Sequence, residues 1–105
     1  MKRILVVDDK EMMRDSVATT LARRGYAVSS AASAAAALEQ LAARPHDAVV
    51  TDLQMPEMDG LGLLEEIRRI DEQLPVILMT AFGSIETAVT AMQKGAWDYI
   101  TKPFN

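Results

Sequence analysis

The sequence lacks cysteine, a signal segment and any long apolar run, and each absence narrows the setting in which the protein works. Without cysteine there is neither a disulfide framework nor a thiolate metal site, which favours a reducing compartment. Only four apolar residues separate the first three residues from two aspartates, too few for a secretory signal. The charge-free segment 73–85 contains Pro75 and Gly83 and is too short to cross a bilayer. We therefore expect a cytoplasmic protein without a membrane segment.

Basic residues are outnumbered by acidic ones, 11 to 15, and the net charge is −4. An acidic chain without a basic stripe repels a polyphosphate backbone, so direct binding of this chain to nucleic acid is not expected. The single histidine, His46, follows Pro45 in a polar loop and is expected to be a surface residue. With 105 residues, 50% of them hydrophobic, the chain can bury a core, and we predict one domain over residues 1–105.

Two hydrophobic periods alternate along the chain. Five short apolar runs bounded by turn residues predict buried strands over residues 3–8, 27–31, 48–52, 76–80 and 97–101. Between them, apolar residues recur at helical spacing and predict four helices. The stripes are Met13, Val17 and Leu21; Ala34, Ala37, Leu38 and Leu41; Leu63, Ile67 and Ile70; and Ile85, Ala88, Val89 and Met92. This alternation predicts an α/β fold, a doubly wound five-stranded parallel sheet with helices on both faces.

Capping residues support these helix positions. Asp8 and Glu11 have the spacing of a capping box before the first helix, and Ser33 is a predicted N-cap of the second. Gly25 follows the first helix, where a left-handed residue is expected.

Polar residues stand where four of the strand-like runs end: Asp8 and Asp9, then Asp52, Thr80 and Lys102. Taken singly, each would be an ordinary cap, turn or surface residue. Together they fall at the carboxyl edge of a parallel sheet, where ligands bind. Neighbouring acids repel one another unless a cation joins them, and an all-oxygen ligand set favours Mg²⁺ over Zn²⁺ or Ca²⁺. Such a site suits phosphoryl transfer to a carboxylate nucleophile, with Thr80 and Lys102 contacting the phosphoryl oxygens.

These residues occur in segments 4–9, 52–60, 79–81 and 102–104, which together resemble the receiver domain of two-component response regulators. The resemblance covers the whole chain and implies the flavodoxin-like, CheY-like strand order 2-1-3-4-5. Segments 80–89 and 94–104 further resemble the NtrC-like subgroup, whose receivers precede an ATPase that activates sigma-54 transcription.

The resemblance implies that Asp52 accepts a phosphoryl group from a phosphohistidine on a sensor histidine kinase. It also implies a Mg²⁺ cofactor. Asp9 and Asp52 would ligate the ion, the Gln54 carbonyl would be a third protein ligand, and Asp8 would act through water.

The remaining roles concern the phosphoryl group and the switch. Thr80 and Lys102 are implied to hold phosphoryl oxygens, and Tyr99 matches the family's aromatic switch residue, which turns inward as Thr80 moves. The Lys102–Pro103 bond is expected to be cis, and Phe82 is expected to slow phosphoryl hydrolysis by excluding water. On this view the chain is not an enzyme, because it promotes only its own phosphorylation and dephosphorylation.

Receivers of this family continue into a fifth helix, whereas this sequence stops at Asn105. We therefore expect a truncated domain whose parent carries a C-terminal effector, a sigma-54 ATPase with a DNA-binding domain. Without a fifth helix, about half of one sheet face and the edge of the fifth strand would be uncovered. A homodimer formed through that side is expected.

Two other functions use similar residues and stay open at this point. A phosphatase of the haloacid dehalogenase type also combines an aspartate nucleophile with threonine and lysine. It requires an acid two residues after the nucleophile, where this sequence has Gln54. A flavodoxin-like flavin carrier would need a phosphate loop rich in hydroxyls and glycine after the first strand, where Asp8-Asp9-Lys10-Glu11 would repel the phosphate.

Overall fold

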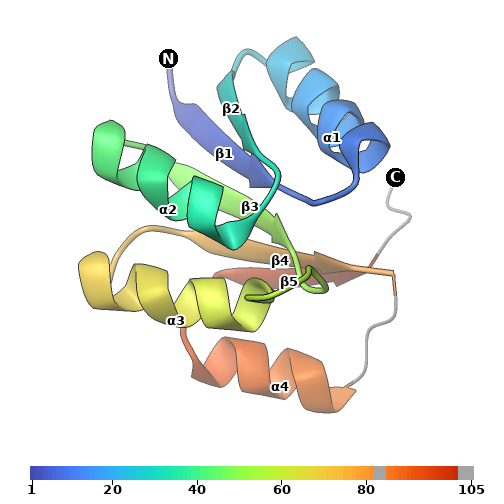
Figure 1. Cartoon of the computed structure of the whole chain (residues 1–105), viewed down its shortest axis with the longest axis vertical. Helices are drawn as coiled ribbons and strands as arrows, with labels where there is room; N and C mark the ends of the chain where they lie inside the picture. Colours follow the sequence, from blue (N-terminus) through green and yellow to red (C-terminus); the bar gives the residue numbers. More distant parts are fainter. Residues whose placement is uncertain (82–84, 102–105) are drawn as a thin grey trace.

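The computed structural model describes residues 1–81 and 85–101, which form one sheet and the helices around it (Figure 1). All strands are parallel and lie in the order β2-β1-β3-β4-β5, which confirms the predicted doubly wound α/β fold. The strands are β1 (Arg3–Val7), β2 (Ala27–Ala31), β3 (Ala48–Asp52), β4 (Val76–Thr80) and β5 (Asp98–Thr101). The described helices are α1 (Glu11–Arg23), α2 (Ala34–Ala43), α3 (Gly60–Ile70) and α4 (Ile85–Gln93).

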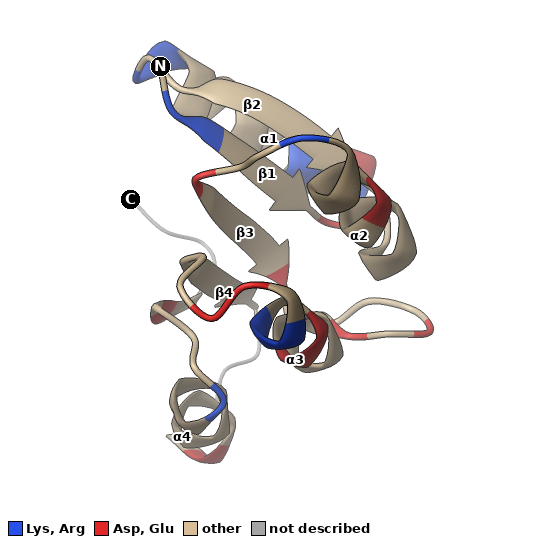
Figure 2. Ribbon diagram, turned by 90° about the vertical axis from the view of Figure 1, so that its left-hand side faces the viewer, with Lys and Arg blue, Asp and Glu red and all other residues tan. Residues whose placement is uncertain are grey.

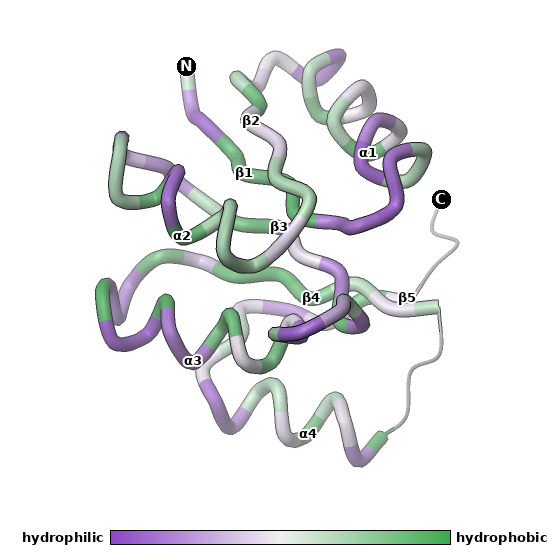
Figure 3. Tube along the Cα trace, viewed as in Figure 1, coloured by the Kyte–Doolittle hydropathy of each residue, from purple (hydrophilic) through white to green (hydrophobic). Residues whose placement is uncertain are grey.

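The two faces of the sheet carry separate hydrophobic clusters. Helices α2, α3 and α4 pack on one face, over fully buried strand residues such as Leu5 and Leu78. Helix α1 packs on the other face, where Val17 belongs to one cluster with Val6 and Met79. Figure 3 shows the central strands as hydrophobic along most of their length. Burial on both faces explains why these strands read as continuous apolar runs rather than as an alternating pattern.

Two of the predicted helix-capping features are confirmed and one is wrong. The Ser33 hydroxyl accepts a hydrogen bond from a backbone N–H in the first turn of α2 at 3.1 Å, and Gly25 has a φ of 93° after α1, both as predicted. The predicted capping box at Asp8 is wrong, because α1 is preceded by Lys10. The Asp8 carboxylate instead accepts the Lys10 N–H at 2.9 Å. Asp8 therefore closes a tight turn between β1 and α1.

The predicted apolar stripes are only partly buried. In α3, Leu63 and Ile67 lie in the core as predicted, whereas Ile70 in the last turn is 69% exposed. In α4 the predicted face is wrong, since Ala91 is the buried residue. Ala91 is small enough to pack into the core, whereas the larger apolar residues of this helix are exposed: Ile85, Val89 and Met92. None of the helices in the described ranges is long and apolar enough to cross a membrane.

Candidate functional site

Three aspartates meet at the carboxyl edge of the sheet. Asp8 and Asp9 follow β1, and Asp52 is the last residue of β3, which pairs directly with β1. Each offers one carboxylate oxygen, and these three oxygens lie within 4.8 Å of one another. Asp8 is 0% and Asp52 3% exposed, whereas the Asp9 side chain is 28% exposed. Figure 2 shows acidic residues at the tip of β3 and in the segment after β1. The structure thus brings together the three predicted acids.

The backbone holds these acids in place. Strand β1 ends at Val7, one residue earlier than predicted, yet the Asp8 N–H still donates to the Ala31 carbonyl at 3.1 Å. The side chain of Arg14 donates to the Asp8 carbonyl at 3.0 Å. After β3, the Leu53 N–H donates to the Met79 carbonyl at 2.7 Å. Both acidic segments are therefore fixed by main-chain contacts across the sheet, independently of their carboxylates.

The acid cluster suits a hard cation. Its donors are carboxylate oxygens, the ligand type that Mg²⁺ and Ca²⁺ prefer. The buried Asp9 Oδ1 accepts no hydrogen bond from the part of the chain that the structure describes. A buried carboxylate oxygen left without a donor is costly, and a bound cation would remove that cost. The observed residues thus fit the Mg²⁺ site that the sequence predicted at Asp8, Asp9 and Asp52.

Two other predicted site residues lie on neighbouring elements. Thr80 is the last residue of β4, next to Met79, which pairs with Asp52 in the sheet. It is 1% exposed, so its hydroxyl lies inside the edge of the sheet rather than on the surface. Gln54 is exposed in the loop after β3 and lines a cleft of about 440 Å³ that extends to Thr87 on α4. Its assignment as a carbonyl ligand stays a prediction.

Tyr99 is the aromatic residue of the last described strand. It lies in β5, opposite Leu78 of β4, and packs against the core on the face covered by α2–α4. Its ring is half-buried, and its hydroxyl is buried without a hydrogen-bond partner among the described residues. The switch role of Tyr99 stays a prediction. Lys102, the Lys102–Pro103 bond and Phe82 lie outside the described residues, so the expectations placed on them also stay predictions.

The structure adds two residues that the sequence reasoning missed. The Lys10 ammonium lies 3.6 Å from Asp9 Oδ1 and 3.9 Å from Asp52 Oδ2. Gly60, the first residue of α3, donates its N–H to the Leu53 carbonyl at 2.8 Å. A Cβ at Gly60 would lie 2.5 Å from the Asp52 carbonyl oxygen. The signal for Lys10 was its place directly after two acids. No local pattern distinguishes Gly60 from an ordinary turn glycine.

Comparison with known proteins decides the family. A family model described as "Response regulator receiver domain" matches residues 4–105, nearly the whole chain. The chain belongs to the response regulator receiver domain family. This receiver domain is 47% identical over 104 residues to a putative NtrX-like response regulator of Rickettsia bellii (strain RML369-C), covering 97% of the chain and 22% of the relative. It is 41% identical over 102 residues to the DNA-binding transcriptional regulator NtrC of Escherichia coli (strain K12), again covering 97% and 22%.

A solved structure gives the same result. The beryllofluoride-activated NtrC4 receiver domain dimer superposes with a TM-score of 0.94 at 35% identity, covering 100% of this chain and 87% of that one. The receiver domain is therefore related to the NtrC-like regulators, as its sequence indicated. It spans about a fifth of the length of the curated relatives named above. These matches do not support the two alternative functions, the phosphatase and the flavin carrier.

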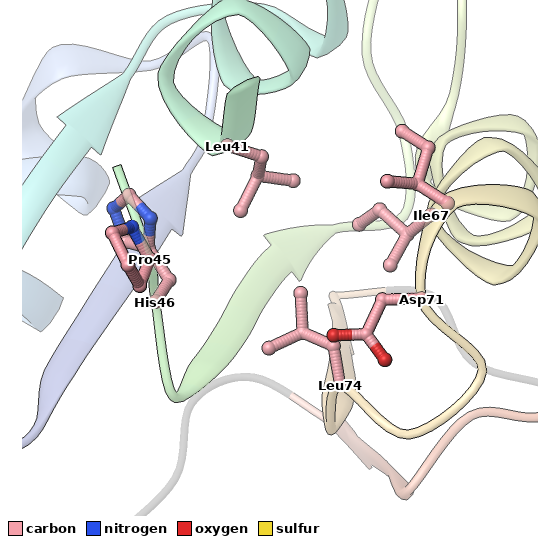
Figure 4. A pocket seen from close by; sticks show the side chains of 7 residues that line it. Leu41, Pro45, His46, Ile67, Asp71 and Leu74 are labelled. Carbon is pink, nitrogen blue, oxygen red and sulfur yellow. The ribbon is translucent and has the colours of Figure 1, made fainter. Parts of the chain in front are cut away.

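A second hollow lies at the opposite, amino-terminal edge of the receiver sheet. It has a volume of about 160 Å³ and is lined mainly by apolar side chains between the last turns of α2 and α3 (Figure 4). His46 lies there and is half-buried. Its Nδ1 lies 3.1 Å from the Arg44 carbonyl. Because a carbonyl can only accept, Nδ1 carries the proton, and the buried Nε2 has no partner among the described residues.

This environment predicts a pH-dependent stability. Burial lowers the pKa of His46 below its ordinary value of 6.5, against the opposing effect of the Arg44 hydrogen bond. A lowered folded-state pKa means that the unfolded chain binds the proton more readily. The stabilising contribution of neutral His46 is therefore complete above pH 6.5 and falls as the pH drops through that value toward the folded pKa. Urea unfolding at pH 7.5 and 5.5 should show wild type losing more stability than His46→Asn, which keeps a donor for Arg44. Equal losses would contradict the assignment.

Proposed function

We propose that this chain is the phosphoacceptor domain of a two-component response regulator. It takes a phosphoryl group from a phosphohistidine of a sensor histidine kinase onto Asp52 and thereby changes the state of an attached effector. The observation that carries the proposal is the convergence of three aspartate oxygens within 4.8 Å, with Asp52 almost fully buried at the end of β3. Membership of the receiver family supports the same role.

The geometry supports a carboxylate nucleophile assisted by a metal. An Asp52 oxygen would form the new bond to phosphorus while the bond to the donor nitrogen breaks, giving an aspartyl phosphate. Bound Mg²⁺ would neutralise charge on the carboxylates and the phosphoryl oxygens, and catalysis of this type rests mainly on positioning and charge. Asp9, Asp52 and the Gln54 carbonyl would hold the ion directly, and Asp8 would act through water.

The remaining side chains have supporting roles in this proposal. The Thr80 hydroxyl would donate to one phosphoryl oxygen, and the Lys102 ammonium would pair with another. Loss of the phosphoryl group to water would reset the site. The chain would thus act on its own aspartate alone, which makes it a switch rather than an enzyme with a separate substrate.

The partners follow from the relatives. Because the chain spans 22% of the length of the NtrC and NtrX-like proteins, we propose that its parent continues into an effector region that regulates transcription. In an NtrC-like protein this region would be a sigma-54 ATPase with a DNA-binding domain, so the acidic receiver itself need not touch DNA.

A homodimer is also proposed. The exposed apolar side chains of α4, with Ile85 at 85% and Val89 at 48%, offer a surface for it beside β5.

Acetyl phosphate tests the proposed function without the cognate kinase. The purified chain, incubated with acetyl phosphate and Mg²⁺, should gain the mass of one phosphoryl group per molecule. The adduct should be stable in acid and labile in base, as an acyl phosphate is, and EDTA should suppress its formation. An unmodified chain under conditions that phosphorylate another receiver, or steady release of phosphate without an adduct, would reject the proposal.

A further inference from the structure

Lys10 follows Asp9 directly and places its ammonium beside the acid cluster. Its backbone N–H donates to Asp8 Oδ1 at 2.9 Å, which fixes the residue at the start of α1. Its ammonium lies 3.6 Å from Asp9 Oδ1 and 3.9 Å from Asp52 Oδ2. Lys10 therefore contacts all three acids, one through its main chain and two through its side chain.

These ion pairs have the geometry of a weak and easily displaced counter-ion. Both ammonium-to-oxygen distances are longer than a hydrogen bond, and the Lys10 side chain is 62% exposed. Exposed lysine pairs contribute little and are screened by salt, because the ammonium stays hydrated on a long flexible stem. The side chains of the two acids it faces are much less exposed, at 28% for Asp9 and 5% for Asp52. Water screens the charges of these two carboxylates less, so a cation beside them is attracted more strongly.

We propose that Lys10 is a tethered counter-ion that competes with Mg²⁺ for the acid cluster and so sets the metal affinity of this receiver. The inference rests on the proposed function, because it assumes that the cluster is the metal site. Metal entry would require the ammonium to leave Asp9 and Asp52, whose oxygens it shares with the ion. Removal of the Lys10 charge is expected to tighten Mg²⁺ binding roughly three- to tenfold, the range that two weak ion pairs can supply.

The test is a titration of the whole chain with Mg²⁺, in which binding is measured by calorimetry and by amide chemical shifts. Lys10→Gln removes the charge and keeps most of the side-chain length, whereas Lys10→Arg keeps the charge. Lys94→Gln is the matched control, because Lys94 pairs with Glu65 on α3 rather than with the cluster. The Mg²⁺ Kd should fall about three- to tenfold in Lys10→Gln, and should stay near the wild-type value in Lys10→Arg and Lys94→Gln. Raising the salt concentration should shrink the difference.

The outcomes separate this inference from the proposed function. A Lys10→Gln variant that binds Mg²⁺ no more tightly than wild type, while both bind it, would overturn the counter-ion role and leave the metal site standing. The same change in Lys94→Gln would also overturn it, since a general charge effect would then explain the result. Absence of Mg²⁺ binding in every variant would reject the metal site itself, and the inference with it.

Discussion

An Asp52→Asn variant is expected to gain no phosphoryl group under conditions that fully phosphorylate the wild-type chain. The asparagine amide has nearly the same shape as the carboxylate, so the end of β3 should keep its structure. A neutral amide is, however, a poor nucleophile, and it removes one anionic ligand from the proposed metal site. Intact mass after incubation with acetyl phosphate and Mg²⁺ measures the effect directly.

The control for this prediction is Asp59→Asn, which makes the same chemical change a few residues later. Asp59 is exposed and caps α3 by accepting the Gly62 N–H at 2.8 Å, a role that asparagine fills equally well. This variant should be phosphorylated like wild type. Asp9→Ala should slow the reaction by weakening Mg²⁺ binding. Phosphorylation of Asp52→Asn at the wild-type rate would show that another residue is the acceptor.

A Gly60→Ala variant is expected to lose about 3 kcal/mol of stability, the upper part of the range for overpacking a buried site. Gly60 is buried where α3 begins against the end of β3. A Cβ there would lie 2.5 Å from the Asp52 carbonyl oxygen and 2.9 Å from the Leu53 Cα, both backbone atoms that cannot rotate away. The strain acts on Asp52, the proposed phosphoacceptor, so the phosphorylation rate should fall as well.

Gly62→Ala is the matched comparison, because it makes the same substitution in the same turn of α3. There the added Cβ meets the Met58 Cγ at 2.8 Å, part of a flexible side chain that can move. Both variants gain a similar helix propensity from alanine, which cancels in the comparison. Urea unfolding should therefore show Gly60→Ala as clearly less stable than Gly62→Ala. Equal midpoints for the two variants would mean that the junction of β3 and α3 relaxes without cost.

The parts of the site that could be predicted are those that depend on strand ends. Asp8, Asp9, Asp52 and Thr80 each follow or end an apolar run, and parallel strands bring their carboxyl ends to one edge. The position of the Lys10 ammonium could not be predicted in this way. A lysine after two acids reads as a solvated helix start, and only the chain path between β1 and α1 places it against Asp52.

Local sequence patterns are sufficient to predict the alternation of strands and helices, the parallel sheet and the residue types at its carboxyl edge. Strands and helices differ in hydrophobic period, and a crossover helix between two consecutive strands allows those strands to run parallel. The buried side of α4 and the close approach of Gly60 to Asp52 depend instead on how the elements pack in three dimensions. The reason is that α4 carries two usable faces, one of small residues and one of larger apolar ones. Which face is buried depends on how the helix packs against the sheet. The sequence of the helix alone does not specify that packing.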